Sequence, residues 1–152
     1  MAMWLMKSEP DVYSLDDLKR DRKTMWDGVR NYQARNYMRS MLVGDQVLYY
    51  HSNCDLPGVV GLARIVKTAY PDPTQFDPKD SHYDPASKRE DPRWSLVDVG
   101  FVKKFRRTVS LSELRDHAKE LGDFALIRTG NRLSVMPVST AQYEVVLRLA
   151  GA

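Results

Sequence analysis

The segment from Trp26 to Arg39 constrains the fold most, because it predicts a tight turn that leads directly into an amphipathic helix. Gly28 is the hinge of this turn, since glycine tolerates backbone angles that other residues avoid. From Asn31 onward, apolar residues recur at helical spacing, so that Ala34, either Tyr37 or Met38, and Met41 can share one buried face. Asn31 is a candidate N-cap. The segment therefore predicts a helix packed on the core and entered through a glycine turn.

The start of this helix is also a candidate anion site. Free N–H groups and the helix dipole favour a phosphate or carboxylate at such a position, and Arg30 and Arg35 add positive charge on either side of Asn31. Trp26, just before the turn, could offer a flat apolar surface beside these charges. The same spacing is explained if Trp26 is a core residue and the arginines are solvated, so both interpretations stay open.

Length and composition predict one soluble domain spanning residues 1–152. A chain of this size buries roughly 70% of its unfolded surface, and no stretch approaches the roughly 20 apolar residues of a membrane span. The N-terminus lacks the pattern of a signal peptide, which predicts a cytoplasmic protein, or a nuclear one in a eukaryote. The net charge of +3 and pI near 9.0 give a mild attraction to polyanions. That attraction alone does not diagnose nucleic-acid binding.

Metal and cofactor chemistry is not indicated. The only cysteine, Cys54, forms no internal disulfide, and with His51, His82 and His117 it makes no recognisable zinc cluster. No Gly-rich phosphate loop, dinucleotide fingerprint or nucleophile elbow is present. We therefore expect neither a metal nor a cofactor.

The remaining pattern predicts strands interspersed with short helices, hence an α+β domain with a curled sheet and helices on its flanks. Helix starts are expected at Ser14, Ser110 and Ser139, where capping residues precede helical runs. The helix after Ser110 should end before Gly122. A first short strand is expected around Trp4 and Met6, ending at Lys7–Pro10. The other expected strands are Gln46–His51, Val59–Val66, Trp94–Phe105, and a hairpin formed by Phe124–Arg128 and Arg132–Met136.

The segment from Tyr70 to Pro92 predicts a long irregular loop, because it holds five prolines and many aspartates without a helical or strand period. Loops of this length are usually functional or disordered. Its aromatic residues argue against simple disorder. We expect the loop to be ordered in part, with Tyr83 folded back towards Trp26.

Several blocks of the chain together resemble the EVE domain family. The blocks, in order, are Trp4–Pro10, Trp26–Asn36, Tyr49–Ser52, Phe76–Pro78, Tyr83–Pro85, Pro92–Trp94 and Arg132–Val138. They cover nearly the whole chain, and their order makes the resemblance more specific than any single block. The resemblance implies a PUA-like fold, a curled β-barrel with peripheral helices, related to the YTH and ASCH domains.

The resemblance also implies a non-enzymatic module that binds DNA or RNA carrying a modified base, such as a methylated or hydroxymethylated cytosine. An unstacked base is held between aromatic or apolar side chains and identified at its polar edge, while cations grip the flanking phosphates. The candidate base-pocket residues are Ser8, Glu9, Trp26, His51, Ser52, Tyr83 and Trp94. The candidate phosphate-binding residues are Arg30, Asn31 and Arg35. We expect a monomer without a membrane partner.

Two other hypotheses stay open. The same cleft could hold a free nucleotide or anionic metabolite in an enzyme or sensor, with His51 and Cys54 as the reactive pair. Alternatively, the loop rich in proline and aspartate could dock another protein. Titrating polynucleotide binding with salt separates the first hypothesis from the second, because phosphate contacts make affinity fall linearly with the logarithm of salt concentration.

Overall fold

One curled sheet runs through the molecule. In the computed structural model, which describes residues 1–152, six strands are hydrogen-bonded in the order β2-β5-β4-β3-β1-β6. The strands are β1 (Met3–Ser8), β2 (Lys23–Met25), β3 (Gln46–His51), β4 (Gly58–Pro71), β5 (Ser95–Ser110) and β6 (Val135–Val138). β1 and β3 are parallel, and the other neighbouring pairs are antiparallel. The α+β class is therefore confirmed, while the sheet has free edges at β2 and β6 and is not closed into a barrel.

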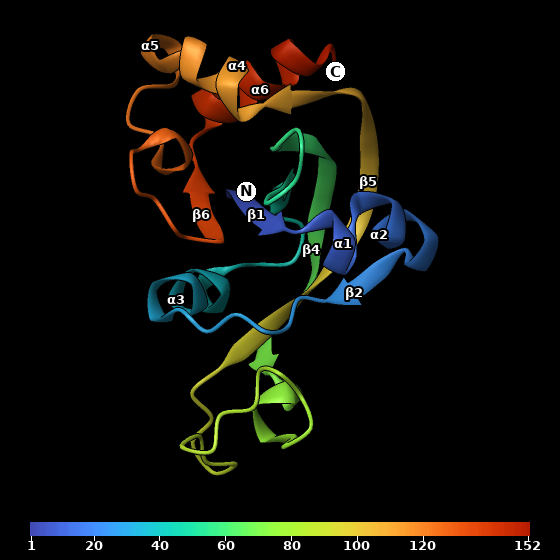
Figure 1. Ribbon diagram of the computed structural model, residues 1–152, viewed down its shortest axis with the longest axis vertical. Coiled ribbons are helices and arrows are strands. Elements are labelled where there is room, and N and C mark those ends of the chain that lie inside the picture. The colour runs from blue at the N-terminus through green and yellow to red at the C-terminus, as the bar shows by residue number, and fades with distance from the viewer.

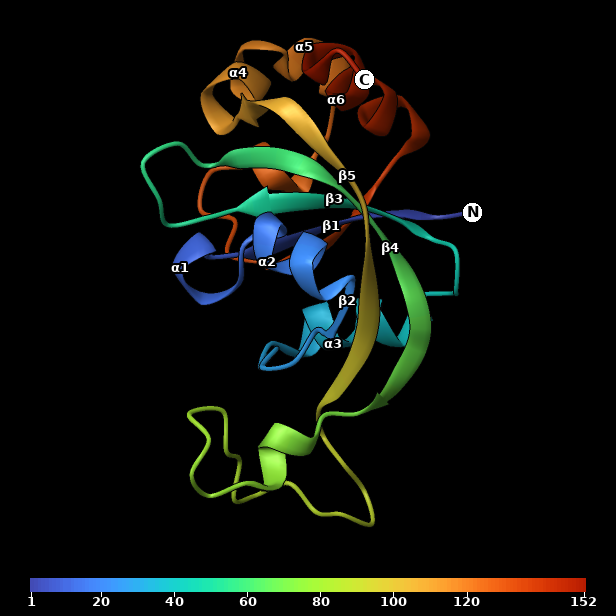
Figure 2. The same ribbon diagram turned by 90° about the vertical axis from the view of Figure 1, so that its right-hand side faces the viewer.

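The curl comes from the two long strands. β4 has 14 residues and β5 has 16, and both bend along their length (Figures 1 and 2). Their pairing shifts register at four places between Val59 and Tyr70. Such irregularities increase local twist and bend a strand. The far ends of β4 and β5 carry the loop between them away from the rest of the sheet (Figure 1).

Both faces of the sheet are buried, so its inner strands have continuous apolar runs. Side chains alternate between faces along a strand, and in β1 Trp4 and Met6 join one core cluster while Leu5 joins the other. Helix α3 (Tyr32–Ser40) covers the first cluster with Ala34 and Met38. Helices α4 (Leu111–Asp116), α5 (Ala118–Leu121) and α6 (Thr140–Ala150) lie together near the C-terminus and contribute to the second (Figure 2).

The predicted helix starts are confirmed by their caps. Ser14 and Asp17 form a reciprocal capping box at α2 (Leu15–Asp21), and Ser139 and Gln142 form another at α6. The Asn31 side chain accepts a hydrogen bond from the Ala34 N–H at 2.9 Å. A single helical turn, α1 (Pro10–Tyr13), separates β1 from α2. None of the helices has the length and apolarity needed to span a membrane.

Two expectations for the C-terminal third are corrected. The helix after Ser110 is divided at His117, whose ring nitrogen Nδ1 lies 2.9 Å from the Glu113 carbonyl oxygen. The hairpin prediction is wrong. Ala125–Ile127 form a 3-10 turn, with Leu126 buried in the second core cluster, and β6 instead pairs antiparallel with β1.

The long loop between β4 and β5 is built around one buried amide. Gln75 lies in a 3-10 turn, Pro73–Phe76, and its side-chain nitrogen donates to the carbonyl oxygens of Asp72 and Trp94 at 2.6 and 2.8 Å. Its side-chain oxygen accepts from Ser87 and from the Trp94 N–H at 2.6 and 3.1 Å. The amide is thus fully paired, and it joins both ends of the loop.

Candidate nucleic-acid interface

A cavity of about 510 Å³ opens where the end of β1, the turn after β2 and the long loop meet. Its size falls in the range of about 300–1,000 Å³ that is usual for small-ligand pockets. Five of its residues are hydrophobic, and polar and charged groups supply the rest. The lining residues are Lys7, Ser8, Glu9, Val12, Tyr13, Thr24, Met25, Trp26, Asp27, Gly28, Val29, Arg30, His82 and Ser134.

The end of β1 is held on both sides, which fixes the polar wall. The Lys7 N–H donates to the Ser134 carbonyl oxygen at 2.8 Å, and the Ser52 N–H donates to the Ser8 carbonyl oxygen at 3.0 Å. Glu9 follows at the N-cap position of α1, and its side chain makes no capping bond there. One of its carboxylate oxygens accepts from the Asn53 amide at 2.6 Å, so the acid is oriented at the cavity edge.

Trp26 forms the aromatic wall and belongs to the core as well. Its side chain is buried in the first cluster, and its ring meets the Tyr49 ring edge-on with centroids 5.4 Å apart. The Trp26 N–H donates to the Val97 carbonyl oxygen at 2.8 Å, which ties the residue to β5. The indole is therefore a rigid surface, because both packing and the backbone hold it.

The turn at Gly28 brings the long loop against the cavity. Gly28 has φ of +82°, and a Cβ placed there would lie only 2.8 Å from the His82 ring. The Gly28 N–H donates to a carboxylate oxygen of Asp72 at 2.8 Å. Glycine is required twice over at this position, once by the backbone angle and once by the close approach of His82.

Arg30 ties the same loop to the turn. Its guanidinium pairs with the buried Asp72 carboxylate at 3.1 Å and donates to the His82 carbonyl oxygen at 2.8 and 3.0 Å. A further bond reaches the Thr74 hydroxyl at 3.0 Å. Burial alone would raise the pKa of Asp72, but hydrogen bonds from Thr74, Gly28 and Arg30 outweigh it and hold that pKa below its usual value.

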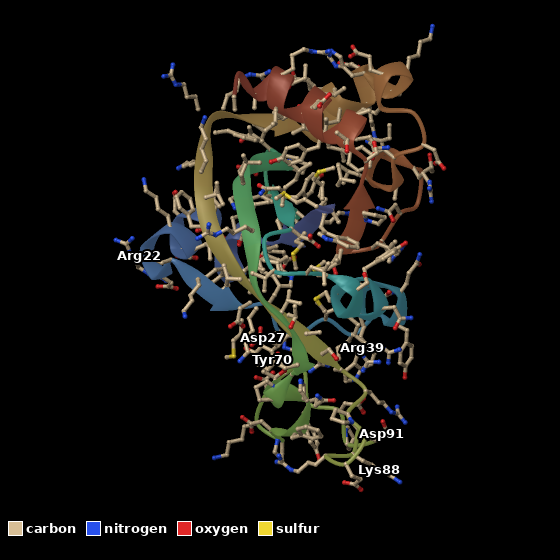
Figure 3. All side chains as sticks on the ribbon, turned by 180° about the vertical axis from the view of Figure 1, so that it is seen from behind. Arg22, Asp27, Arg39, Tyr70, Lys88 and Asp91 are labelled. Atoms are coloured by element: carbon tan, nitrogen blue, oxygen red, sulfur yellow. The ribbon has the colours of Figure 1, made fainter.

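Asp27 contributes a carboxyl group to the cavity and lies where the sheet meets the long loop (Figure 3). Partial removal of water raises its pKa, and the neighbouring Asp72 charge raises it further. No cluster of three or more His, Cys, Asp or Glu side chains is arranged to hold a metal ion. With Ser8 and Glu9, Asp27 gives the cavity hydrogen-bonding groups beside an aromatic wall, and that combination can bind a flat polar ring.

Comparison with known proteins identifies the family. A family model for the EVE domain matches residues 2–149. This chain belongs to the EVE domain family. Human thymocyte nuclear protein 1 is 45% identical over 164 residues, covering 96% of this chain and 72% of the relative.

Solved structures of this EVE family share the fold closely. A protein from Pseudomonas syringae has a TM-score of 0.95 at 48% identity, with 98% of this chain and 99% of that chain covered. The human THYN1 protein, solved in complex with 5-methylcytosine-containing DNA, has a TM-score of 0.95 at 44% identity and covers 100% and 99% of the two chains. An ASCH protein from Zymomonas mobilis, at 8% identity and a TM-score of 0.57, has a similar fold.

The structure brings together only some of the residues predicted for this EVE site. Ser8, Glu9, Trp26 and Arg30 line the cavity. His51 lies elsewhere, where its Nε2 accepts from the Leu15 N–H at 3.1 Å and burial lowers the pKa of the imidazole.

The other predicted base-pocket residues also lie outside the cavity lining. Trp94 is buried in the base of the loop, where it donates to Asp84 at 2.7 Å and stacks on Tyr32. Tyr83 is 40% exposed, and its neighbour His82 makes the contact with the turn. Ser52 takes part through its backbone alone, by the bond to Ser8.

The residues predicted to grip phosphates have bonds within the protein. Arg30 holds the loop, Asn31 caps α3, and Arg35 donates to the Arg93 carbonyl oxygen at 2.9 Å. Their phosphate contacts stay predictions. The sequence did not single out Lys7, Asp27 or His82 for the cavity, although each lies next to a residue that it did single out.

The Gly28 turn can be tested against a matched glycine. In Gly28→Ala, the strained backbone should lower the free energy of unfolding by about 1–3 kcal/mol. The clash of the new methyl group with the His82 ring should add a further loss. Gly44→Ala is the control, since Gly44 has φ of +93° but nothing within 4 Å of an added Cβ. Urea denaturation measures both. Equal losses in the two variants would show that the His82 contact is unimportant.

The ion pair between Asp72 and Arg30 predicts that the stability of the protein depends on pH. Because its folded pKa is depressed below 3.8, Asp72 contributes stability that is present above that value and lost as pH falls through the folded pKa. Asp72→Asn should lower the free energy of unfolding by about 3 kcal/mol at pH 7, and by much less in acid. Asp77→Asn, an exposed change in the same loop, should show neither effect. A pH-independent loss in the Asp72 variant would contradict this.

Proposed function

We propose that this protein is a non-enzymatic reader of modified cytosine in DNA, which accepts the unstacked base in the cavity beside Trp26. The observation that carries the proposal is the cavity itself, whose lining combines Trp26 with carboxyl and hydroxyl groups. A relative that matches this chain over its full length is solved with 5-methylcytosine-containing DNA. The same fold at 44% identity supports the same class of ligand here.

The chemistry of a cytosine fits the groups around the cavity. The base presents a flat face, which Trp26 can stack against, and an exocyclic amine, which an ionised carboxylate can accept from. Glu9 and Asp27 are the two carboxylates of the lining, and the Ser8 hydroxyl can donate or accept. Taking the base out of the duplex gives these groups access to its polar edge.

The enzyme or sensor hypothesis has less support. It requires His51 and Cys54 to act in the same cleft, and neither residue lines the cavity. The Nε2 atom of His51 already accepts a hydrogen bond from the Leu15 N–H. This bond holds the start of α2 and explains the position of His51. We therefore place no reaction in this cavity.

Binding to matched oligonucleotides tests the proposal. A methyl group in an apolar pocket contributes about 1–3 kcal/mol, so DNA with one 5-methylcytosine should bind roughly 10–200-fold more tightly than its unmodified match. Fluorescence anisotropy on duplexes with cytosine, 5-methylcytosine and 5-hydroxymethylcytosine, with RNA of equal sequence as comparison, measures the preference. Equal affinity for every DNA ligand would rule out the proposed function.

The stacking role of Trp26 makes a separate prediction. Trp26→Leu keeps an apolar side chain in the core but removes the aromatic face, and it should weaken DNA binding by about 1–3 kcal/mol. The dependence of affinity on salt should not change, because no charge is removed. Trp4→Phe, a change of a buried tryptophan outside the cavity lining, is the control for lost core packing. If both folded variants bind like the parent, Trp26 does not stack on the base.

A further inference from the structure

A second concave surface lies beside the cavity, across β2. It is lined by Lys19, Asp21, Arg22, Lys23, Arg64, Val66, Gly100 and Phe101, and we call it the basic groove. Its volume is about 690 Å³. Thr24 and Met25 of β2 line the cavity, while Lys23 of the same strand lines the groove. Only this short edge strand separates the two.

Strand register places two cations on opposite sides of the groove. Lys23 of β2 and Arg64 of β4 are both paired with Gly100 of the intervening β5. Residues paired directly across strands share a face, so the three positions form one row, with the two cations separated by two strand spacings, about 10 Å. Gly100 puts no side chain between them. A Cβ there would lie 2.9 Å from Val66 and 3.9 Å from the Arg64 side chain.

Arg22 adds a third cation in an unusual backbone conformation. Its φ is +71°, a region that non-glycine residues rarely adopt. Two hydrogen bonds stabilise this conformation. The Arg22 N–H donates to the Leu18 carbonyl oxygen at 2.7 Å, and the Phe101 N–H donates to the Arg22 carbonyl oxygen at 2.8 Å. Figure 3 shows Arg22 at the outer margin of the molecule, at the end of α2. An arginine stands where glycine would be less strained.

The charges of the groove are unbalanced. Its four cations are Lys19, Arg22, Lys23 and Arg64, all of them exposed, and none is in an ion pair. The single acid, Asp21, is already neutralised, because Arg20 and the Tyr13 hydroxyl donate to its carboxylate. Elsewhere the protein pairs several of its exposed cations, as Lys104 with Asp16 and Arg107 with Glu113.

We propose that the basic groove binds the phosphates of the DNA strand whose modified base occupies the cavity. This inference rests on the proposed function for the identity of the polymer. From Lys23 to Trp26 the chain spans about 10 Å, which corresponds to about three base-pair rises along the axis of a duplex. A strand that crosses β2 can therefore place a base beside Trp26 and its flanking phosphates on the groove. Arg30, Asn31 and Arg35 each have a hydrogen-bond partner inside the protein, whereas the four cations of the groove have no ion-pair partner.

The salt dependence of binding tests the groove. The double variant Lys23→Ala/Arg64→Ala should lower the slope of log affinity against log salt by about 1.8 on duplex DNA, about 0.9 for each lost phosphate contact. Between 50 and 200 mM salt the parent should then lose about twelvefold more affinity than the variant. Lys119→Ala/Arg132→Ala removes the same charge from exposed positions outside the groove and should retain most of the slope.

The outcomes separate this inference from the proposed function. The groove variant should keep the parent's preference for 5-methylcytosine, since phosphate contacts do not identify a base. The inference is overturned if the groove variant keeps the parent slope, if the control variant loses as much, or if the slope changes on RNA alone. If the parent shows no preference for the mark, the proposed function fails. The slope on unmodified DNA still tests the groove in that case.

Arg22→Gly gives a second readout that a structural role would not produce. Glycine adopts φ of +71° without strain, so the thermal midpoint should stay the same or rise, while DNA affinity and the salt slope fall. Circular dichroism and anisotropy measure the two quantities on the same preparation. If the Arg22→Gly variant binds DNA like the parent, Arg22 does not contribute to DNA binding by the groove.

Discussion

The geometry of the cavity depends on one buried carboxylate. Asp72 accepts from the Gly28 N–H and Arg30 with one oxygen, and from the Thr74 N–H and hydroxyl with the other. A buried carboxylate is tolerated only when such partners replace the water that it lost. Because two of these donors come from the turn after β2, Asp72 joins the long loop to the sheet. His82 is placed on the cavity wall by the same junction.

This arrangement engages the Arg30 guanidinium with partners inside the protein. Its guanidinium satisfies the loop carbonyl at His82 and the Asp72 charge, and it also lies over the Trp94 ring, 5.4 Å from the centroid. The walls of the cavity are consequently fixed before a ligand arrives, which lowers the entropy lost on binding. Arg30 is already paired inside the protein, whereas the four cations of the basic groove across β2 are unpaired.

Local signals in the sequence were enough for the helix starts and most strands, because capping residues and apolar runs act on near neighbours. Ser14, Asn31 and Ser139 cap helices as predicted. The failures involve partners distant in the chain. β6 pairs with β1 across more than 120 residues, and the partner of Arg30 lies 42 residues away. Nothing within the Trp26–Arg39 segment indicates that its first arginine will be used by a loop that follows two further strands.

Because separate surfaces bind the base and the phosphates, the cavity sets the selectivity for the mark and the groove sets the general affinity for DNA. A methyl mark changes the free energy of binding by about 1–3 kcal/mol, whereas each phosphate contact strengthens marked and unmarked DNA alike. Adding cations to the groove would raise the affinity for every DNA sequence without improving the ratio of affinities for marked and unmarked DNA. Since unmarked sites compete in large numbers, a reader of one small mark gains from few phosphate contacts. A groove with four unpaired cations, on a chain of net charge +3, fits that requirement better than a strongly basic surface would.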